Sequence, residues 1–107
     1  MRPTPDKAAG IRRIWNAWLV SMQGLRTAFL TEAAFRQEVA IVLVLLPVAF
    51  VIDVSAAERA LLAASAMLIL IVELINSAIE KTLDRISPDI HDLTKSAKDM
   101  GSAAVFL

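Results

Sequence analysis

The sequence contains no cysteine, a single histidine and only 6% aromatic residues. Without cysteine the chain can form neither disulfides nor thiolate metal sites, so a bound metal would need oxygen ligands or His91. The 11 basic and 11 acidic residues cancel, and a chain without a basic surplus is not expected to bind nucleic acid. These absences exclude thiol chemistry and argue against a nucleic-acid partner.

Glycine is also scarce, because Gly10, Gly24 and Gly101 are the only three in the chain and stand far apart. The sequence therefore has neither a Walker-type phosphate loop nor the glycine loop and Asp-Phe-Gly motif of protein kinases. A nucleotide would have to be held by cationic side chains and magnesium. Charged side chains are present for this, although in a polar loop they are more often simply solvated.

Hydrophobic residues, in contrast, make up 57% of the chain, and its mean hydropathy is +0.62. A soluble domain is usually about half apolar, so this composition favours a membrane protein. Two apolar runs, at 39–52 and 60–79, are the centres of two predicted membrane spans at 33–52 and 56–80. A span needs roughly 20 residues, so the first run is expected either to draw in part of "EAAFRQE" or to sit in a locally thin region of the membrane.

The segments outside these runs complete one predicted domain over 1–107. Residues 1–10 are expected to be a mobile lead-in without a signal peptide, and 11–31 an amphipathic helix with tryptophans opposite arginines. That pattern suits the plane of a membrane interface, and also a helix packed on a protein core. Residues 81–101 are predicted to be a polar loop and 102–107 the start of a third span.

The basic residues indicate an orientation for the spans. Six lie before Val39, one lies in the turn between the spans, and four lie between Lys81 and Lys98. Since cytoplasmic segments carry an excess of lysine and arginine, the N-terminus and the 81–101 loop are expected in the cytoplasm.

A polar stripe interrupts the second apolar run. Glu73, Asn76 and Glu80 are spaced i, i+3 and i+7 and so share one face of the predicted helix. A carboxylate in hydrocarbon is costly and usually functional, so Glu73 is a candidate general base. The alternative is a glutamate that only hydrogen-bonds a neighbouring helix.

Glu80 is shallower in the predicted span and could share a divalent cation with Glu32, which lies between the amphipathic helix and the first span. Two carboxylates plus substrate phosphates are a usual way to hold magnesium. The competing interpretation pairs Glu32 with Arg36 at i, i+4.

Three motifs carry a resemblance to a known family: "EAAFRQE" at 32–38, "ELINSAIEKTLDRI" at 73–86 and "AKDMGSAAV" at 97–105. In their order and spacing they resemble the small integral-membrane diacylglycerol kinases of Gram-negative bacteria. The resemblance implies an all-α membrane protein of the bacterial inner membrane, a homotrimer whose subunits each have a surface helix and three spans. Here two spans are expected complete and the third truncated after Leu107.

The same resemblance implies the chemistry and the residues. The enzyme would transfer the γ-phosphate of ATP to diacylglycerol, giving phosphatidate, with Mg²⁺ as cofactor. Glu73 would be the catalytic base with Asn76 beside it, and Glu32 and Glu80 would bind the metal. ATP would be contacted by Arg13, Val20, Glu32, Glu80, Asp89, Ile90, His91, Lys98 and Asp99. The lipid would be contacted by Arg13, Ala17, Arg26, Ala34, Glu38, Glu73 and Ser102.

Three other functions remain open at this stage. One is undecaprenol phosphorylation by a member of the same family, since lipid choice is poorly encoded in a short sequence. Another is a small proton-coupled transporter, which would be expected to have four spans and short loops. The last is a non-catalytic membrane subunit, in which Glu73 would only pack.

Overall fold

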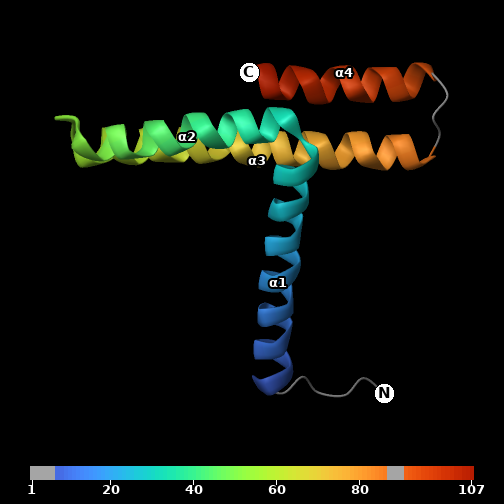
Figure 1. The fold of residues 1–107 in the computed structure, drawn as a ribbon, viewed down its shortest axis with the longest axis horizontal. Coiled ribbons are helices and arrows are strands. Elements are labelled where there is room, and N and C mark those ends of the chain that lie inside the picture. The colour runs from blue at the N-terminus through green and yellow to red at the C-terminus, as the bar shows by residue number, and fades with distance from the viewer. Residues whose placement is uncertain (1–6, 87–90) are drawn as a thin grey trace.

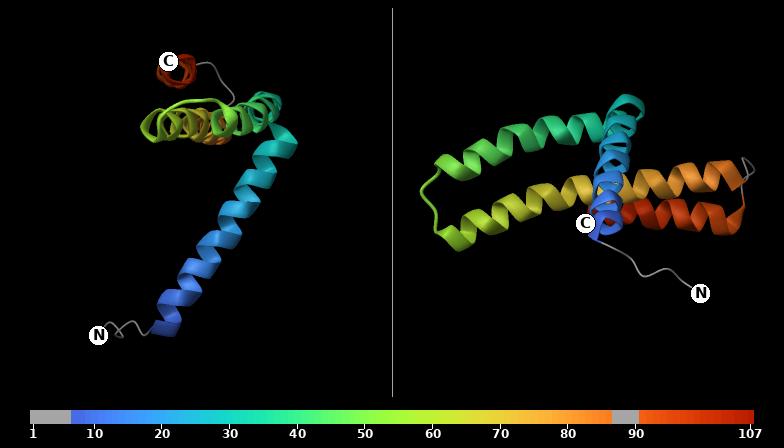
Figure 2. Two further views of the ribbon diagram at one scale, coloured as in Figure 1. Left: turned by 90° about the vertical axis from the view of Figure 1, so that its left-hand side faces the viewer. Right: turned by 90° about the horizontal axis from the view of Figure 1, so that it is seen from below.

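The computed structural model describes residues 7–86 and 91–107, and this part of the chain contains four helices and no strand. Their bounds are α1 Lys7–Thr31, α2 Ala33–Val51, α3 Ala56–Ile86 and α4 Asp92–Phe106. Helix α2 packs along one part of α3, and α4 packs along another (Figure 1). Helix α1 contacts α2 near their junction and runs crosswise to the other three (Figures 1 and 2). The all-α prediction is confirmed.

The packed seam between α2 and α3 repeats every seven residues. Phe35, Val42 and Ala49 are buried on α2, and Ala66 and Glu73 are buried on α3. A seven-residue interval keeps side chains on one face of a helix, so two such helices can lie side by side over their length. Glu73 occupies a seam position that an apolar residue would ordinarily take.

Helices α2 and α3 are long and apolar enough to cross a membrane, with 19 and 31 residues. Many of their large apolar side chains are exposed in the single chain, such as Leu43 at 67% and Leu61 at 69%. The radius of gyration is 18.3 Å, whereas a compact domain of this length has about 13 Å. The chain therefore presents its apolar surface outward, as expected for a protein surrounded by lipid.

The helices depart from the predicted segments at three places. The helix expected from residue 11 begins at Lys7, because Lys7, Ala8 and Ala9 are favourable helix residues. The second span was expected to end at 80 and to be followed by a loop over 81–101. Instead α3 continues to Ile86 and α4 begins at Asp92.

The start of α4 has local causes that explain the missed helix. His91 is its N-cap, and Nδ1 of the imidazole accepts a hydrogen bond from the Leu93 N–H at 3.1 Å. Asp92 in the first turn interacts favourably with the helix dipole. Lys95 and Asp99 form an i, i+4 ion pair at 2.7 Å. These polar contacts stabilise a helix where hydropathy alone indicates a loop.

The junction of α1 and α2 is a single residue, Glu32, with extended backbone angles of φ −116 and ψ 107. Arg36 stabilises the turn, because its Nη1 donates to the Phe29 carbonyl at 2.8 Å and the Leu30 carbonyl at 3.3 Å. These are end carbonyls of α1 that lack helical partners. The Glu32–Arg36 ion pair is therefore not formed, and the Glu32 side chain is left to face α3.

Arg59 stabilises the turn between α2 and α3. Its guanidinium donates to the carbonyls of Ala49 at 2.7 Å, Val54 at 3.3 Å and Ile52 at 3.5 Å. The Ala49 carbonyl lies in the last turn of α2, where carbonyls lack helical partners, and the Ile52 carbonyl, which also accepts from the Val54 N–H, belongs to the C-cap residue.

Replacing Arg59 with methionine, which keeps the aliphatic stem, should destabilise this turn. We expect a loss of about 1.5 kcal/mol, because a charged donor is removed from partly buried carbonyls. The measurement is the midpoint of thermal unfolding in detergent, followed by the loss of helical circular dichroism. Arg12→Met, at an exposed position of α1, is the control; an equal midpoint for both variants would contradict this role of Arg59.

Candidate active site

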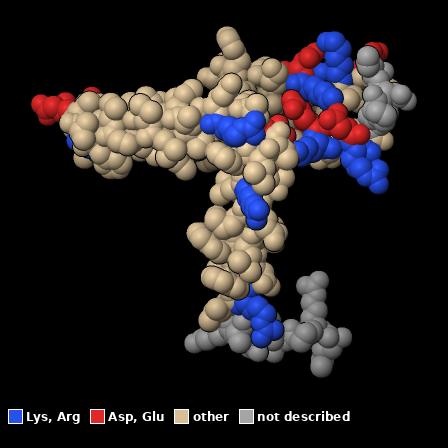
Figure 3. Space-filling view, viewed as in Figure 1, with Lys and Arg blue, Asp and Glu red and all other residues tan. Residues whose placement is uncertain are grey.

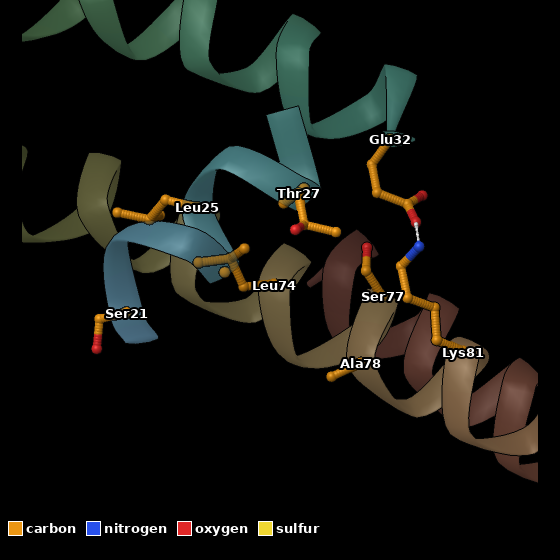
Figure 4. A pocket seen from close by; sticks show the side chains of 10 residues that line it. Ser21, Leu25, Thr27, Glu32, Leu74, Ser77, Ala78 and Lys81 are labelled. Atoms are coloured by element: carbon orange, nitrogen blue, oxygen red, sulfur yellow. Dashed lines mark ion pairs between the residues drawn. The ribbon is translucent and has the colours of Figure 1, made fainter. Parts of the chain in front are cut away.

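A pocket of about 530 Å³ lies where the end of α1, the Glu32 junction and the middle of α3 meet. Its lining is mostly apolar, and Glu32 and Lys81 lie at one end of it (Figure 4). The lining residues are Ser21, Gly24, Leu25, Thr27, Ala28, Glu32, Leu74, Ser77, Ala78 and Lys81. A cavity with apolar walls and a few polar groups suits an amphipathic ligand.

Glu32 and Lys81 form the charged end of the pocket. The Lys81 Nζ lies 3.1 Å from Oε1 of Glu32 and donates to the Thr31 hydroxyl at 3.2 Å. The sequence reasoning missed Lys81 as a site residue. A signal was present, because Glu73, Ser77 and Lys81 are spaced i, i+4 and i+8 and so lie along one side of α3.

Glu73 is the most deeply placed carboxyl group of the site. It is 5% exposed and sits on the α2–α3 seam. Glu73 interacts electrostatically with Glu80 and Glu32. It also interacts electrostatically with Glu38 of α2. The structure thus brings four carboxyl groups from α2, α3 and the Glu32 junction into electrostatic range of one another.

Asn76 lies between the carboxyl groups around Glu73 and helix α4. It is 8% exposed, and its amide nitrogen donates to Oε1 of Glu80 at 3.4 Å. Its amide oxygen is buried and has no hydrogen-bond partner among the described residues. Gly101 of α4 lies directly against this amide, so that a Cβ atom at 101 would collide with the Asn76 oxygen. The sequence reasoning did not identify Gly101 as part of the site.

Charged residues gather where the C-terminal end of α3 meets α4 (Figure 3). Lys98 pairs with Asp84 across these helices at 2.8 Å, and the hydrogen bond to Asp84 raises the pKa of Lys98. The hydrogen bond and charge of Asp99 likewise raise the pKa of Lys95. Both lysines therefore remain cationic at neutral pH.

Several predicted contact residues are not brought to Glu73 within one chain. Arg13, Ala17 and Val20 are exposed on the part of α1 that Figure 1 shows projecting away from the other helices. Arg26, Ala34 and Ser102 are exposed as well. Asp89 and Ile90 lie outside the described residues.

Glu38 differs from these predicted contacts because it is one of the four carboxyl groups that interact around Glu73. Its Oε2 is buried without a hydrogen-bond partner among the described residues. It lines a second pocket between α2, α3 and the end of α4. A buried acceptor of this kind is available to a hydroxyl donor from a ligand.

The carboxyl groups of the site meet only part of the coordination that a metal ion requires. Within 7–86 and 91–107, no three acidic or histidine side chains converge to hold one. Glu32 and Glu80 are nevertheless half-buried carboxylates beside Glu73. Magnesium is usually held by one or two carboxylates, with water and substrate phosphates completing its coordination. The residues fit an ion that arrives with a phosphate ligand and do not form an all-protein cage.

Comparison with known proteins identifies the family of the chain. Residues 19–107 match the family model described as prokaryotic diacylglycerol kinase. The chain belongs to the prokaryotic diacylglycerol kinase family. The expectation from the three sequence motifs is thereby confirmed.

Individual relatives within the prokaryotic diacylglycerol kinase family support this assignment. A protein named diacylglycerol kinase from Pseudomonas aeruginosa is 56% identical over 108 residues, which cover 100% of this chain and 88% of the relative. One from Escherichia coli K12 is 49% identical over 102 residues, covering 95% and 84%. One from Helicobacter pylori is 42% identical over 100 residues, covering 94% and 78%.

Proposed function

We propose that this chain is a lipid kinase that transfers the γ-phosphoryl group of ATP to the free hydroxyl of diacylglycerol, giving phosphatidate and ADP. The observation that carries the proposal is the position of Glu73. It is a buried carboxyl group within an apolar helix long enough to span a membrane, near two further carboxylates. A lipid hydroxyl can reach that depth from the bilayer, whereas ATP approaches from water, so the reaction is placed at their boundary.

Glu73 acts as the general base in this mechanism. Its carboxylate accepts the proton of the lipid hydroxyl as the lipid oxygen forms a bond to the γ-phosphorus. The bond between that phosphorus and the bridging oxygen of ADP breaks, and ADP leaves with the bonding electrons. Phosphoryl transfer depends mostly on positioning and charge neutralisation, so one base and fixed cationic groups suffice.

Glu32 and Glu80 are the groups that would hold Mg²⁺. The ion, when bound, would neutralise charge on the transferred phosphoryl group. Asn76 fixes Glu80 through its amide nitrogen. The Glu73 carboxylate is held apart from bulk water on the α2–α3 seam, so the proton that it accepts comes from the substrate hydroxyl.

The remaining predicted contacts divide between the two substrates. Lys98, His91 and Asp99 are at the charged end of α3 and α4, where the phosphates and base of ATP would be bound. Glu38 and Ser102 would contact the lipid. Arg13, Ala17, Val20 and Arg26 would serve from α1, which in one chain projects away from the cluster.

A homotrimer would bring the predicted contact residues of α1 close to Glu73, from which they are separated within one chain. We propose it because α1 of one subunit could then reach the carboxyl groups around Glu73 of another. We further propose the bacterial inner membrane as the location, with the N-terminus and the segment between α3 and α4 on the cytoplasmic side, where ATP is available.

Phosphate incorporation in mixed detergent micelles tests this function. The purified protein should transfer labelled phosphate from ATP to diacylglycerol, with at least tenfold lower turnover on undecaprenol. Omitting Mg²⁺ and adding a chelator should abolish the transfer. Faster turnover of undecaprenol would assign the chain to that lipid instead, and no transfer to either lipid would refute the proposed function.

A further inference from the structure

The ion pair between Glu32 and Lys81 occupies a position that the proposed function needs for a metal. The pair joins the α1–α2 junction to α3, and Figure 4 shows the Lys81 side chain directed at the Glu32 carboxylate at one end of the pocket. The same ammonium donates to Thr31, so it is held by two oxygens from the junction.

No second cation among the described residues neutralises Glu32. Arg36, four residues along, donates to the carbonyls of Phe29 and Leu30. The Glu32 side chain is 24% exposed, and a partly buried carboxylate near Glu73 and Glu80 is unfavourable without a counter-ion. Lys81 therefore supplies the charge compensation at this position.

Lysine can also be displaced from the carboxylate. Its ammonium is a compact charge on a flexible stem, and the Lys81 side chain is 51% exposed, so water can solvate it once it leaves the carboxylate. A divalent cation bound to the Glu32 carboxylate would lie close to the Lys81 ammonium, which is 3.1 Å from Oε1. The two positive charges repel each other at that distance, so each weakens the binding of the other.

We propose that Lys81 is the resident counter-ion of Glu32 and competes with Mg²⁺ for it, thereby setting the Mg²⁺ concentration at which the site fills. This inference rests on the proposed function for the presence of the metal. It assigns to Lys81 a role in tuning affinity, distinct from catalysis. Between turnovers Lys81 holds Glu32 in place, and on metal binding the ammonium moves to solvent beside the pocket.

Binding of Mn²⁺, a paramagnetic substitute for Mg²⁺, tests the competition directly. Free Mn²⁺ is measured by electron paramagnetic resonance with the full chain in micelles and a non-hydrolysable ATP analogue. Lys81→Met should bind Mn²⁺ about two- to five-fold more tightly, the range expected when a partly exposed ion pair no longer competes. Lys81→Arg should retain weak binding, because the competing charge is kept.

Two further variants distinguish competition for Glu32 from a general effect of removing a positive charge. Arg85→Met removes the same charge one turn along α3, at an exposed position, and should change Mn²⁺ affinity by less than half as much. Glu32→Gln should abolish the difference between lysine and methionine at position 81.

Unchanged or weaker Mn²⁺ binding by Lys81→Met would overturn the proposal, as would an equal gain from Arg85→Met or binding that does not depend on Glu32. Because no phosphate transfer is measured, these outcomes are independent of the lipid assay. A protein that fails the lipid assay and still shows the competition would refute the kinase activity alone.

Discussion

Glu73→Gln should lower the rate of phosphoryl transfer to diacylglycerol by about 10²- to 10⁴-fold, the range for loss of a general base. Glutamine has nearly the same shape and can still pack on the α2–α3 seam, where Glu73 is 5% exposed. It cannot accept a proton from the lipid hydroxyl. The measurement is kcat in mixed micelles at saturating ATP, Mg²⁺ and lipid.

The control for this prediction is Glu58→Gln, in the first turn of the same helix. Glu58 is exposed and its carboxylate oxygen accepts from the Ser55 N–H, a bond that glutamine can also accept. This variant should keep full activity. The binding of Mn²⁺ with the ATP analogue should be retained by Glu73→Gln, since the proposed metal ligands Glu32 and Glu80 are unchanged. A kcat within threefold of the wild type would contradict the assignment of Glu73 as the base.

Gly101→Ala should reduce kcat by about 10- to 100-fold, a typical cost of misplacing a reacting group. A Cβ atom at 101 would collide with the Asn76 side-chain oxygen. The Asn76 side chain is short and its amide can rotate. We therefore expect the amide to move while α3 and α4 stay packed. The displaced Asn76 would then no longer hold Glu80, to which it donates at 3.4 Å.

A double-mutant cycle distinguishes this positioning effect from a general loss of structure. Asn76→Ala removes the group that the new methyl strikes, so adding Gly101→Ala to it should change kcat by less than twofold. Gly10→Ala, at a glycine with open space around it, should leave kcat unchanged.

The thermal unfolding midpoint is the second readout. Gly101→Ala should shift the stability by no more than about 1 kcal/mol, the lower end for extra packing volume. Additive losses in the double mutant would show that Gly101 does not act through Asn76. A wild-type kcat for Gly101→Ala would lead to the same conclusion.

The predictable parts of the site are those encoded by local spacing. Glu73 and Asn76 lie three residues apart on one apolar helix, and both are buried in the structure. The extension of the stripe to Glu80 also followed from helical periodicity, and the Asn76 amide now connects to it. Hydropathy was similarly sufficient to place α2 and most of α3.

The parts that could not be predicted depend on contacts between distant segments. The sequence offers Arg36 as the local partner of Glu32, but that guanidinium binds the end of α1 instead. Lys81 reaches Glu32 only because α1 ends beside the middle of α3. The contact of Gly101 with Asn76 likewise requires α4 to pack on α3.

The helix that replaced the predicted loop was missed for another reason. Its first turns are polar, so a search for apolar runs assigned 81–101 to a loop. Its signals were the N-cap His91, the acidic first turn and the Lys95–Asp99 pair. Each is weak alone, and together with packing against α3 they define α4.

The crosswise direction of α1 has a consequence for how the protein senses its surroundings. If α2 and α3 cross the bilayer and α1 rests on its surface, Glu32 is the hinge between a vertical and a horizontal element. The depth of the Glu32 carboxylate in the membrane is then set by the position of α1 at the surface, while the depth of Glu73 is set by α3, which crosses the bilayer. A thicker or thinner bilayer would change the distance between Glu32 and Glu73 along the membrane normal. Membrane thickness would then affect the geometry of the site.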